Sequence, residues 1–309
     1  MNIGREYIPP QLDLEKAASI NTGKRWFYSF ASCPLEYIYD VNPKKELLVA
    51  LRERGVDLFT FVHRNFLNDS ADAMYSFHKE VENYAIMRIV SYSEWWSSTI
   101  KKRERQSVKK AKKSGVTVKK VIINEDFLRG VQKIYNETPF REGRRYSGYG
   151  QSIQILEKKF GNIGDSDILG AYLNSELIGL LWITFGDRAA MFRSFVSLLK
   201  YRDKCPNNAL ISEAVQRCAE RNIRFLVYGD KYGFIPSLDR FREHQGFCKF
   251  PLPRYYVPLT TRGQLAIKLK AHRKLEYSLP LPIERVGLRL YNSASRILPR
   301  SIWYQLGEE

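Results

Sequence analysis

Long apolar runs and paired cysteines are both missing from this chain of 309 residues. No apolar stretch approaches the ~20 residues that a membrane-spanning helix needs. The opening MNIGREYIPPQLDLEK does not have the basic-then-apolar order of a secretion signal. None of the four cysteines forms a Cys-x-x-Cys pair, and the four histidines are scattered. We therefore expect free thiols, no bound metal and a cytoplasmic location.

Three motifs that would indicate well-known chemistry are absent as well. The sequence contains no GxGxxG, no GxxxxGK[ST] and no GxSxG. These absences argue against a Rossmann dinucleotide site, a P-loop and an esterase elbow. We find no internal repeat of 20–50 residues. A hydrophobic share of 44% and a charged share of 27% are those of an ordinary globular chain.

Positive charge is plentiful and unevenly distributed. The chain has 50 Lys and Arg against 33 Asp and Glu, a net charge of +17. Residues 1–95 have a balance of −2, so residues 96–309 have a balance of +19. A field of that sign favours an anionic partner, which can be nucleic acid, a phosphorylated cofactor or an anionic membrane surface.

The densest positive charge lies in Lys101–Lys113, which consists mostly of Lys and Arg. We expect it to belong to one helix that Ser93 caps and that runs to Gly115. A few apolar residues at helical spacing give this helix a thin packing face. Two interpretations stay open: a solvated helix lying across the protein, or a helix that faces phosphates.

Residues 1–94 predict an N-terminal α/β subdomain. A short helix is expected at Pro43–Glu53, with Asn42 as its N-cap. Strands are expected at Lys24–Ala31, Val56–His63 and Tyr84–Val90.

From Val116 onward the pattern is regular. Turn pairs Asn174-Ser175 and Gly186-Asp187 join three central strands into hairpins. Hairpins followed by a strand–helix–strand crossover indicate an α/β (α+β) fold with a mixed, largely antiparallel sheet flanked by helices. The strands are expected at Val116–Ile123, Ile168–Leu173, Leu177–Phe185, Ala189–Ser197, Arg224–Tyr228, Phe247–Phe250 and Arg254–Val257. The helices are expected at Asn124–Thr138, at Gln151–Phe160, from Asn207 or Asn208 to Asn222, and at Ser237–Gln245.

The C-terminal segment is a basic tail with apolar residues at helical spacing. It reads either as a pair of docking helices or as an amphipathic segment on an anionic membrane surface. The predicted organisation is therefore three parts: residues 1–94, 95–258 and 259–309.

Four motifs follow one another in residues 95–258. They are the basic segment RERQSVKKAKKSGVTV, the hairpin segment ILGAYLNSELIGLLWITFGDRAAMFRSFVS, the helix and strand CPNNALISEAVQRCAERNIRFLVYG, and the helix and turn SLDRFREHQGF. In this order they resemble the GNAT acyltransferases, and more narrowly the Fem-type peptidyltransferases. The first is similar to the helix and strand that precede the acyltransferase domain, and the others are similar to its central hairpins, its following helix and strand, and its closing helix and turn.

The resemblance implies an enzyme that joins an acyl or aminoacyl group to an amine. Its donor would be acyl-CoA or aminoacyl-tRNA, with no metal. One branch of the family acts in cell-wall and surface-glycan assembly, so the acceptor would be a small or lipid-linked amine. The amphipathic basic tail is a separate reason to expect peripheral contact with the inner membrane face. A two-half layout would make residues 1–94 a degenerate second GNAT-like half.

A donor's phosphates are expected at the helix that starts near Asn207, because helix N-termini offer unpaired N–H groups and a positive dipole end. GNAT enzymes usually place a Gly-rich turn here, whereas Lys200–Asn208 contains no glycine. That departure leaves aminoacyl-tRNA or a disabled site open beside coenzyme A. The predicted donor-binding residues are Tyr201, Lys204, Asn207, Asn208 and Ala209.

The acceptor is expected at the loop Pro139–Gly150, although a plain solvated loop would have the same composition. Arginines can hold carboxylate or phosphate bidentately, and tyrosines can stack on a sugar or base. Glu137 is a further candidate base. The predicted acceptor-binding residues are Arg141, Arg144, Arg145 and Tyr146, and the predicted catalytic residues are Glu142, Tyr149 and Asp230, the last of which can also be a simple turn residue.

Transfer chemistry needs the strands Ala189–Ser197 and Arg224–Tyr228 to separate, so that a carrier's arm can enter between them. The competing hypothesis is a catalytically silent GNAT fold that binds RNA or an anionic membrane through its basic face.

Overall fold

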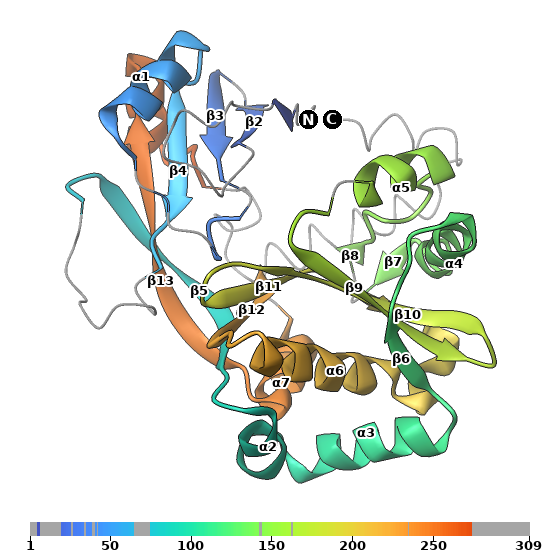
Figure 1. Ribbon diagram of the computed structural model, residues 1–309. Helices are drawn as coiled ribbons and strands as arrows, with labels where there is room; N and C mark the ends of the chain where they lie inside the picture. The colour runs from blue at the N-terminus through green and yellow to red at the C-terminus, as the bar shows by residue number, and fades with distance from the viewer. Residues whose placement is uncertain are drawn as a thin grey trace. The chain divides into compact units, whose positions relative to one another are not determined.

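The computed structural model describes residues 5–6, 20–25, 27–33, 35–38, 41, 43–64, 75–141, 144–161, 163–233 and 235–273 (Figure 1). The chain divides into two compact units. Unit 1 comprises residues 1–82, 143–145 and 252–309, and unit 2 comprises residues 83–142 and 146–251. Among the described residues, no helix has the length and apolar character needed to cross a membrane.

Unit 1 contains a β-sheet and, in its described residues, two helices. Its strands lie in the order β1, β2, β3, β4 and β13, with β3 and β4 parallel and the other pairs antiparallel. Phe59, Phe61 and Tyr255 stack at the centre of its core. The elements are β1 (Arg5–Glu6), β2 (Ile20–Arg25), β3 (Tyr28–Ser32), α1 (Lys45–Glu53), β4 (Leu58–Val62), β13 (Cys248–Pro258, which begins in unit 2) and α8 (Thr261–Lys268).

Unit 2 has the mixed sheet that the sequence predicts. Its strands lie in the order β5, β12, β11, β10, β9 and β6, and only β11 and β12 run parallel. The strands are β5 (His78–Arg88, which begins in unit 1), β6 (Thr117–Lys120), β9 (Ser166–Leu173), β10 (Glu176–Phe185), β11 (Ala189–Ser197) and β12 (Phe225–Lys231). The helices are α2 (Tyr92–Glu94), α3 (Lys102–Lys113), α4 (Glu125–Tyr135), α5 (Ile153–Phe160), α6 (Pro206–Glu220) and α7 (Pro236–Gln245). Two short strands lie in the loop Pro139–Gly150, β7 (Phe140–Arg141) in unit 2 and β8 (Arg144–Arg145) in unit 1.

Helices cover both faces of this sheet, so its central strands are buried almost throughout. Gly130 of α4 lies against Leu177 of β10, and Leu210 of α6 lies against Gly179 of the same strand. Figure 1 shows α4 and α5 on one side of the sheet and α6, with α3 beyond it, on the other. This layering follows from the apolar runs of β9 and β10.

The predicted single helix from Ser93 to Gly115 is wrong. Ser91, not Ser93, accepts the capping hydrogen bond from the N–H of Glu94. A π-helical turn follows α2, and Ile100 takes an extended conformation before α3 begins. Tertiary contacts impose this break, because the indole N–H of the buried Trp95 donates to the Gln245 carbonyl.

The start of α6 also differs from the prediction. Cys205, in the left-handed region at φ 57°, is the N-cap, and Pro206 occupies the first helical position. Neither Asn207 nor Asn208 caps the helix. Proline is suited to that position because its fixed φ matches the helix and its missing N–H needs no partner there.

Three strand and helix boundaries in unit 1 need correction. The segment Lys24–Ala31 is divided by a turn between β2 and β3, so it forms parts of two strands. The helix α1 begins at Lys45, and Lys44 rather than Asn42 is its N-cap. The two strands predicted on either side of Pro251 form the single strand β13.

The C-terminal tail is described only as far as residue 273. Its first part is α8, which Thr260 caps by accepting from the N–H of Gly263. The rest of the predicted tail, residues 274–309, lies outside the described residues.

Candidate functional site

The neighbouring parallel strands β11 and β12 pair over only three residues. The register runs from Ala189 opposite Phe225 to Met191 opposite Val227 and extends no further in the described residues. Both strands continue beyond this point, β11 to Ser197 and β12 to Lys231. The two strands that the transfer hypothesis needs to separate therefore stop pairing partway along their length.

A β-bulge lies on β11 just beyond the last paired residue. Ser194 lies opposite Trp182 of β10, but the next residue of β10, Ile183, lies opposite Phe192. Arg193 is thus the additional residue on β11. A bulge bends its strand and increases its local twist, which helps to turn β11 away from β12.

Aromatic rings connect β11 and β12 where the pairing has ended. The ring of Tyr228 lies 5.5 Å from that of Phe192 and 5.9 Å from that of Phe195. Phe247 adds a further contact to Tyr228 at 5.5 Å. At Gly229 an added Cβ would lie 2.5 Å from the carbonyl oxygen of Phe192, so only glycine fits this approach.

A network of hydrogen bonds around Arg141 fixes the end of β11. The Arg141 guanidinium donates to the carbonyls of Ser197 and Ile134 at 2.8 and 2.9 Å and to the Glu137 carboxylate at 3.1 Å. Glu137 in turn accepts the backbone N–H groups of Leu199 and Lys200. Arg141, expected at the acceptor, and Glu137, expected as a base, both bind the protein's own backbone, and their expected roles stay predictions.

Tyr146, another predicted acceptor residue, packs beneath this network. The Arg141 guanidinium lies 5.0 Å from its ring centroid, and the Tyr135 ring meets it edge-on at 5.4 Å. Burial raises the pKa of the Tyr146 hydroxyl, so this group stays protonated near neutral pH.

Sequence reasoning missed a polar group on β11 that faces α4. The hydroxyl of Tyr135 lies 3.2 Å from the Ser194 hydroxyl and accepts from the Lys159 ammonium at 3.2 Å. The Tyr135 side chain is buried. From the spacing of apolar residues in α4, Tyr135 was expected to be a core residue. Its contact with Ser194 depends on the register of β11, which the sequence does not show.

The N-terminus of α6 offers fewer unpaired donors than an ordinary helix start. Pro206 has no N–H, and the N–H groups of Asn208 and Ala209 both point to the Cys205 carbonyl at 3.2 and 3.4 Å. The Asn208 side chain donates to Glu104 of α3 at 2.6 Å. Asn207 is half-buried, and its Oδ1 has no partner in the described part of the chain.

The segment between β11 and α6 is a 3₁₀ helix, Leu199–Lys204, that holds the other two predicted donor-binding residues. Tyr201 donates its hydroxyl to Glu176 at 2.6 Å, and Lys204 pairs with Asp203 at 3.1 Å. Hydrogen bonds from Lys133, Tyr201 and Lys200, opposed by partial burial, lower the pKa of Glu176 to about 2.

Known proteins resemble this chain in structure but not detectably in sequence. No family model matches the chain, and no curated protein matches its sequence. Among solved structures, the C-terminal domain of a protein assigned as a lysylphosphatidylglycerol synthetase from Agrobacterium fabrum is similar at 13% identity, with 81% of this chain and 84% of that chain covered and a TM-score of 0.51. FemX is similar at 13% identity, with 81% and 86% covered and a TM-score of 0.51. L-PGS from Bacillus licheniformis is similar at 16% identity, with 88% and 99% covered and a TM-score of 0.50.

The chain has a GNAT-like fold. This confirms the fold class predicted from the sequence and the resemblance to Fem-type proteins. At such low identity the likeness concerns the fold alone, so it assigns no residue a role.

Of the three predicted catalytic residues, Tyr149 is fully described, Asp230 only in its backbone, and Glu142 not at all. Asp230 lies in β12, beyond the last residue that pairs with β11, and its side chain is outside the described set. Tyr149 is half-buried, and its N–H donates to the Tyr146 carbonyl in a turn. Glu142 lies outside the described residues, as do the side chains of Arg144 and Arg145 in β8.

Proposed function

We propose that unit 2 transfers an acyl or aminoacyl group from an activated carrier to an amine. The observation that carries this proposal is the end of pairing between β11 and β12 after Met191 and Val227. The carrier's arm would lie between the two strands beyond the close approach of Gly229 to Phe192, with its carbonyl oxygen toward the edge of β11. Backbone N–H groups on such an edge can stabilise the negative charge that develops on that oxygen.

In the proposed reaction the amine nitrogen attacks the carbonyl carbon. The new C–N bond replaces the C–O or C–S bond to the carrier, the nitrogen loses a proton, and the carrier leaves as a hydroxyl or thiol. A carboxylate or a water must take that proton. Asp230 is the candidate on β12, because its position lies beyond the last residue of that strand that pairs with β11.

We favour aminoacyl-tRNA over acyl-CoA as the donor. The start of α6 offers Asn207 as its remaining backbone donor, which suits a pyrophosphate poorly. Along α3, by contrast, the exposed basic residues include Lys102, Arg103 and Lys109, and a shallow hollow is lined by Gln106, Lys109, Lys110, Lys113 and Ser114. Clustered cations of this kind bind a phosphate backbone.

For the acceptor we propose an amine of a lipid-linked cell-envelope precursor at the inner membrane face. The name of the Agrobacterium relative refers to a lipid that carries an amino acid. Because Arg141 is bound within the protein, we propose Arg144 and Arg145 as the residues that hold an acidic headgroup.

Binding and transfer measurements test the proposal. Titration calorimetry is done with total aminoacylated tRNA, uncharged tRNA and acetyl-CoA. Aminoacylated tRNA or acetyl-CoA should bind with micromolar affinity. Transfer of a labelled amino acid to amine-bearing lipid should fall at least tenfold in Asp230→Asn, and Asp126→Asn on the exposed face of α4 is the control. Absence of binding by every donor would overturn the proposal.

A silent RNA-binding module is the second candidate, and the basic α3 favours it. Such a module would bind charged and uncharged tRNA equally, with an affinity that falls steeply with salt. It would transfer no acyl or aminoacyl group from any of the donors.

A further inference from the structure

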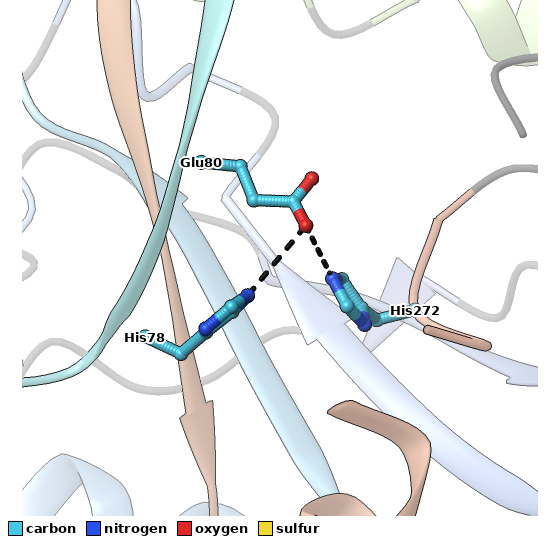
Figure 2. A group of neighbouring side chains, drawn as sticks. All are labelled: His78, Glu80 and His272. Atoms are coloured by element: carbon cyan, nitrogen blue, oxygen red, sulfur yellow. Dashed lines mark hydrogen bonds and ion pairs between the residues drawn. The ribbon is translucent and has the colours of Figure 1, made fainter. Parts of the chain in front are cut away.

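Unit 1 brings two histidines and a glutamate together at one point. His78 and Glu80 lie on β5, where residues two apart point to the same face of the strand. His272 follows the end of α8, far along the chain. Figure 2 shows the Glu80 carboxylate between the two imidazoles, with one oxygen linked to both.

The distances are those of a compact polar cluster. The Glu80 Oε1 atom lies 2.9 Å from Nε2 of His272 and 3.5 Å from Nε2 of His78. All three possible ligand atoms lie within 4.8 Å of one another. Tetrahedral coordination at ~2.0–2.2 Å per bond needs ligand atoms roughly 3.3 Å apart. The half-exposed His78 side chain has room to make that adjustment.

His272 is held firmly in place by its surroundings. Its carbonyl accepts from Arg25 at 2.9 Å, and the Ala271 carbonyl accepts from the Tyr28 hydroxyl at 3.0 Å. Its ring packs edge-on against Tyr256 with centroids 4.5 Å apart, and its side chain is 1% exposed. The position of this nitrogen is therefore fixed before any ligand binds.

The ring of His272 also has the polarity of a metal ligand. Its Nδ1 lies 3.3 Å from the Ala266 carbonyl oxygen, and its Nε2 lies against the Glu80 carboxylate. Both neighbours are acceptors, whereas a neutral imidazole has only one N–H. An imidazolium with two N–H groups satisfies both acceptors, and so does a metal ion bound at Nε2, which would leave Nδ1–H donating to the Ala266 carbonyl, as metal-bound histidines usually do.

We propose that His78, Glu80 and His272 bind a divalent transition-metal ion such as Zn²⁺. Two imidazole nitrogens and one carboxylate oxygen form a ligand set that zinc accepts, with a fourth position left for water. Arg273 also donates to Oε1 of Glu80 at 2.9 Å, and it would move to the second carboxylate oxygen. This proposal departs from the sequence prediction that the chain binds no metal, and it is independent of the proposed transfer reaction.

The ion would tie the start of β5 to the segment after α8 within unit 1. Because the ligands come from distant parts of the chain, binding should couple to the folding of this unit. We therefore expect a stabilising structural role, visible without any assay of activity.

The test uses the untagged, chelator-treated full chain. Calorimetric titration with Zn²⁺ should show one saturable site, and Co²⁺ should produce the visible absorption of a four- or five-coordinate ion. Zn²⁺ should also raise the thermal midpoint. In His78→Ala and Glu80→Gln the affinity for Zn²⁺ should fall by a factor of about 10–100 or more. Zn²⁺ should no longer raise the thermal midpoint of these variants.

Lys79→Ala is the matched control, because Lys79 lies between the two ligands and points to the opposite face of β5. It should bind Zn²⁺ like the parent chain. Circular dichroism checks that each variant is folded, which the exposure of His78 favours. Equal binding by the parent, His78→Ala and Glu80→Gln, or no saturable site in the parent, would overturn the proposal.

Discussion

Asn208, at the start of α6, donates its side-chain N–H to the Glu104 carboxylate of α3 at 2.6 Å. His244 of α7 lies 3.3 Å from the other oxygen of the same carboxylate. Glu104, in the first turn of the basic helix α3, thus joins three helices. Asn208, predicted from the sequence to bind a donor, is occupied in holding α6 against α3.

Replacing Glu104 by Ala should lower the stability of the protein. It would leave the buried Asn208 amide without its acceptor, which costs about 1–3 kcal/mol. Urea unfolding measures the loss. Gln106→Ala, an exposed change on the same helix, should alter stability by less than about 0.5 kcal/mol. Equal midpoints for the two variants would show that the contact contributes nothing.

Arg141→Lys should destabilise the end of β11. A lysine cannot reproduce the fork that reaches Ser197, Ile134 and Glu137 together, so buried carbonyls lose their donor at a cost of about 1–3 kcal/mol. The matched control is Arg129→Lys, whose partner Glu125 lies on the exposed face of α4. Chemical denaturation measures the free energy of unfolding of both variants. If Arg129→Lys is as unstable as Arg141→Lys, Arg141 does not stabilise the end of β11 as we infer.

Glu176 should give the protein a pH-dependent part of its stability. Its pKa of about 2 in the folded chain lies below the ~4.3 of an unfolded chain, so the stabilisation is complete above pH ~4.3 and disappears as the pH falls toward 2. We expect Glu176→Gln to be about 1 kcal/mol less stable than the parent at pH 7, after allowance for solvent screening. The difference should shrink below pH 4. Urea midpoints at pH 7 and pH 3 check this, and a gap that widens in acid would contradict the sign.

The four cysteines should differ in reactivity. Burial raises the pKa of the Cys33 and Cys218 thiols, whereas Cys205 is half-buried and Cys248 is exposed. Alkylation at pH 8 followed by mass spectrometry should label Cys248 first, then Cys205, and reach the other two only in denaturant. Labelling of Cys218 in the native chain would contradict its buried placement.

Local sequence signals predicted the central part of the fold well. The strand β11 has the predicted limits, and Asn124 caps α4 by accepting from the N–H of Phe127. The hairpin turn predicted at Asn174-Ser175 is also present. Both residues take the left-handed conformation that such turns need. These features depend on neighbours in the sequence.

Features that depend on distant contacts were missed. The break at Ile100 follows from the bond between Trp95 and Gln245, which no local pattern reveals. The bond from Arg141 to the Ser197 carbonyl could not be predicted either, because Ser197 lies at the end of β11, far from Arg141 in the sequence. The histidine cluster was missed because His272 lies almost two hundred residues from the His-x-Glu of β5; that alternating pair was the only local signal.

The double hydrogen bond from Leu199 and Lys200 to Glu137 has a practical consequence for mutagenesis. A screen that scores only the proposed transfer activity would rank Glu137 among the essential positions, and its position beside the loop Pro139–Gly150 would suggest a role in the chemistry. Recording melting temperature beside turnover separates a collapsed loop from a missing base.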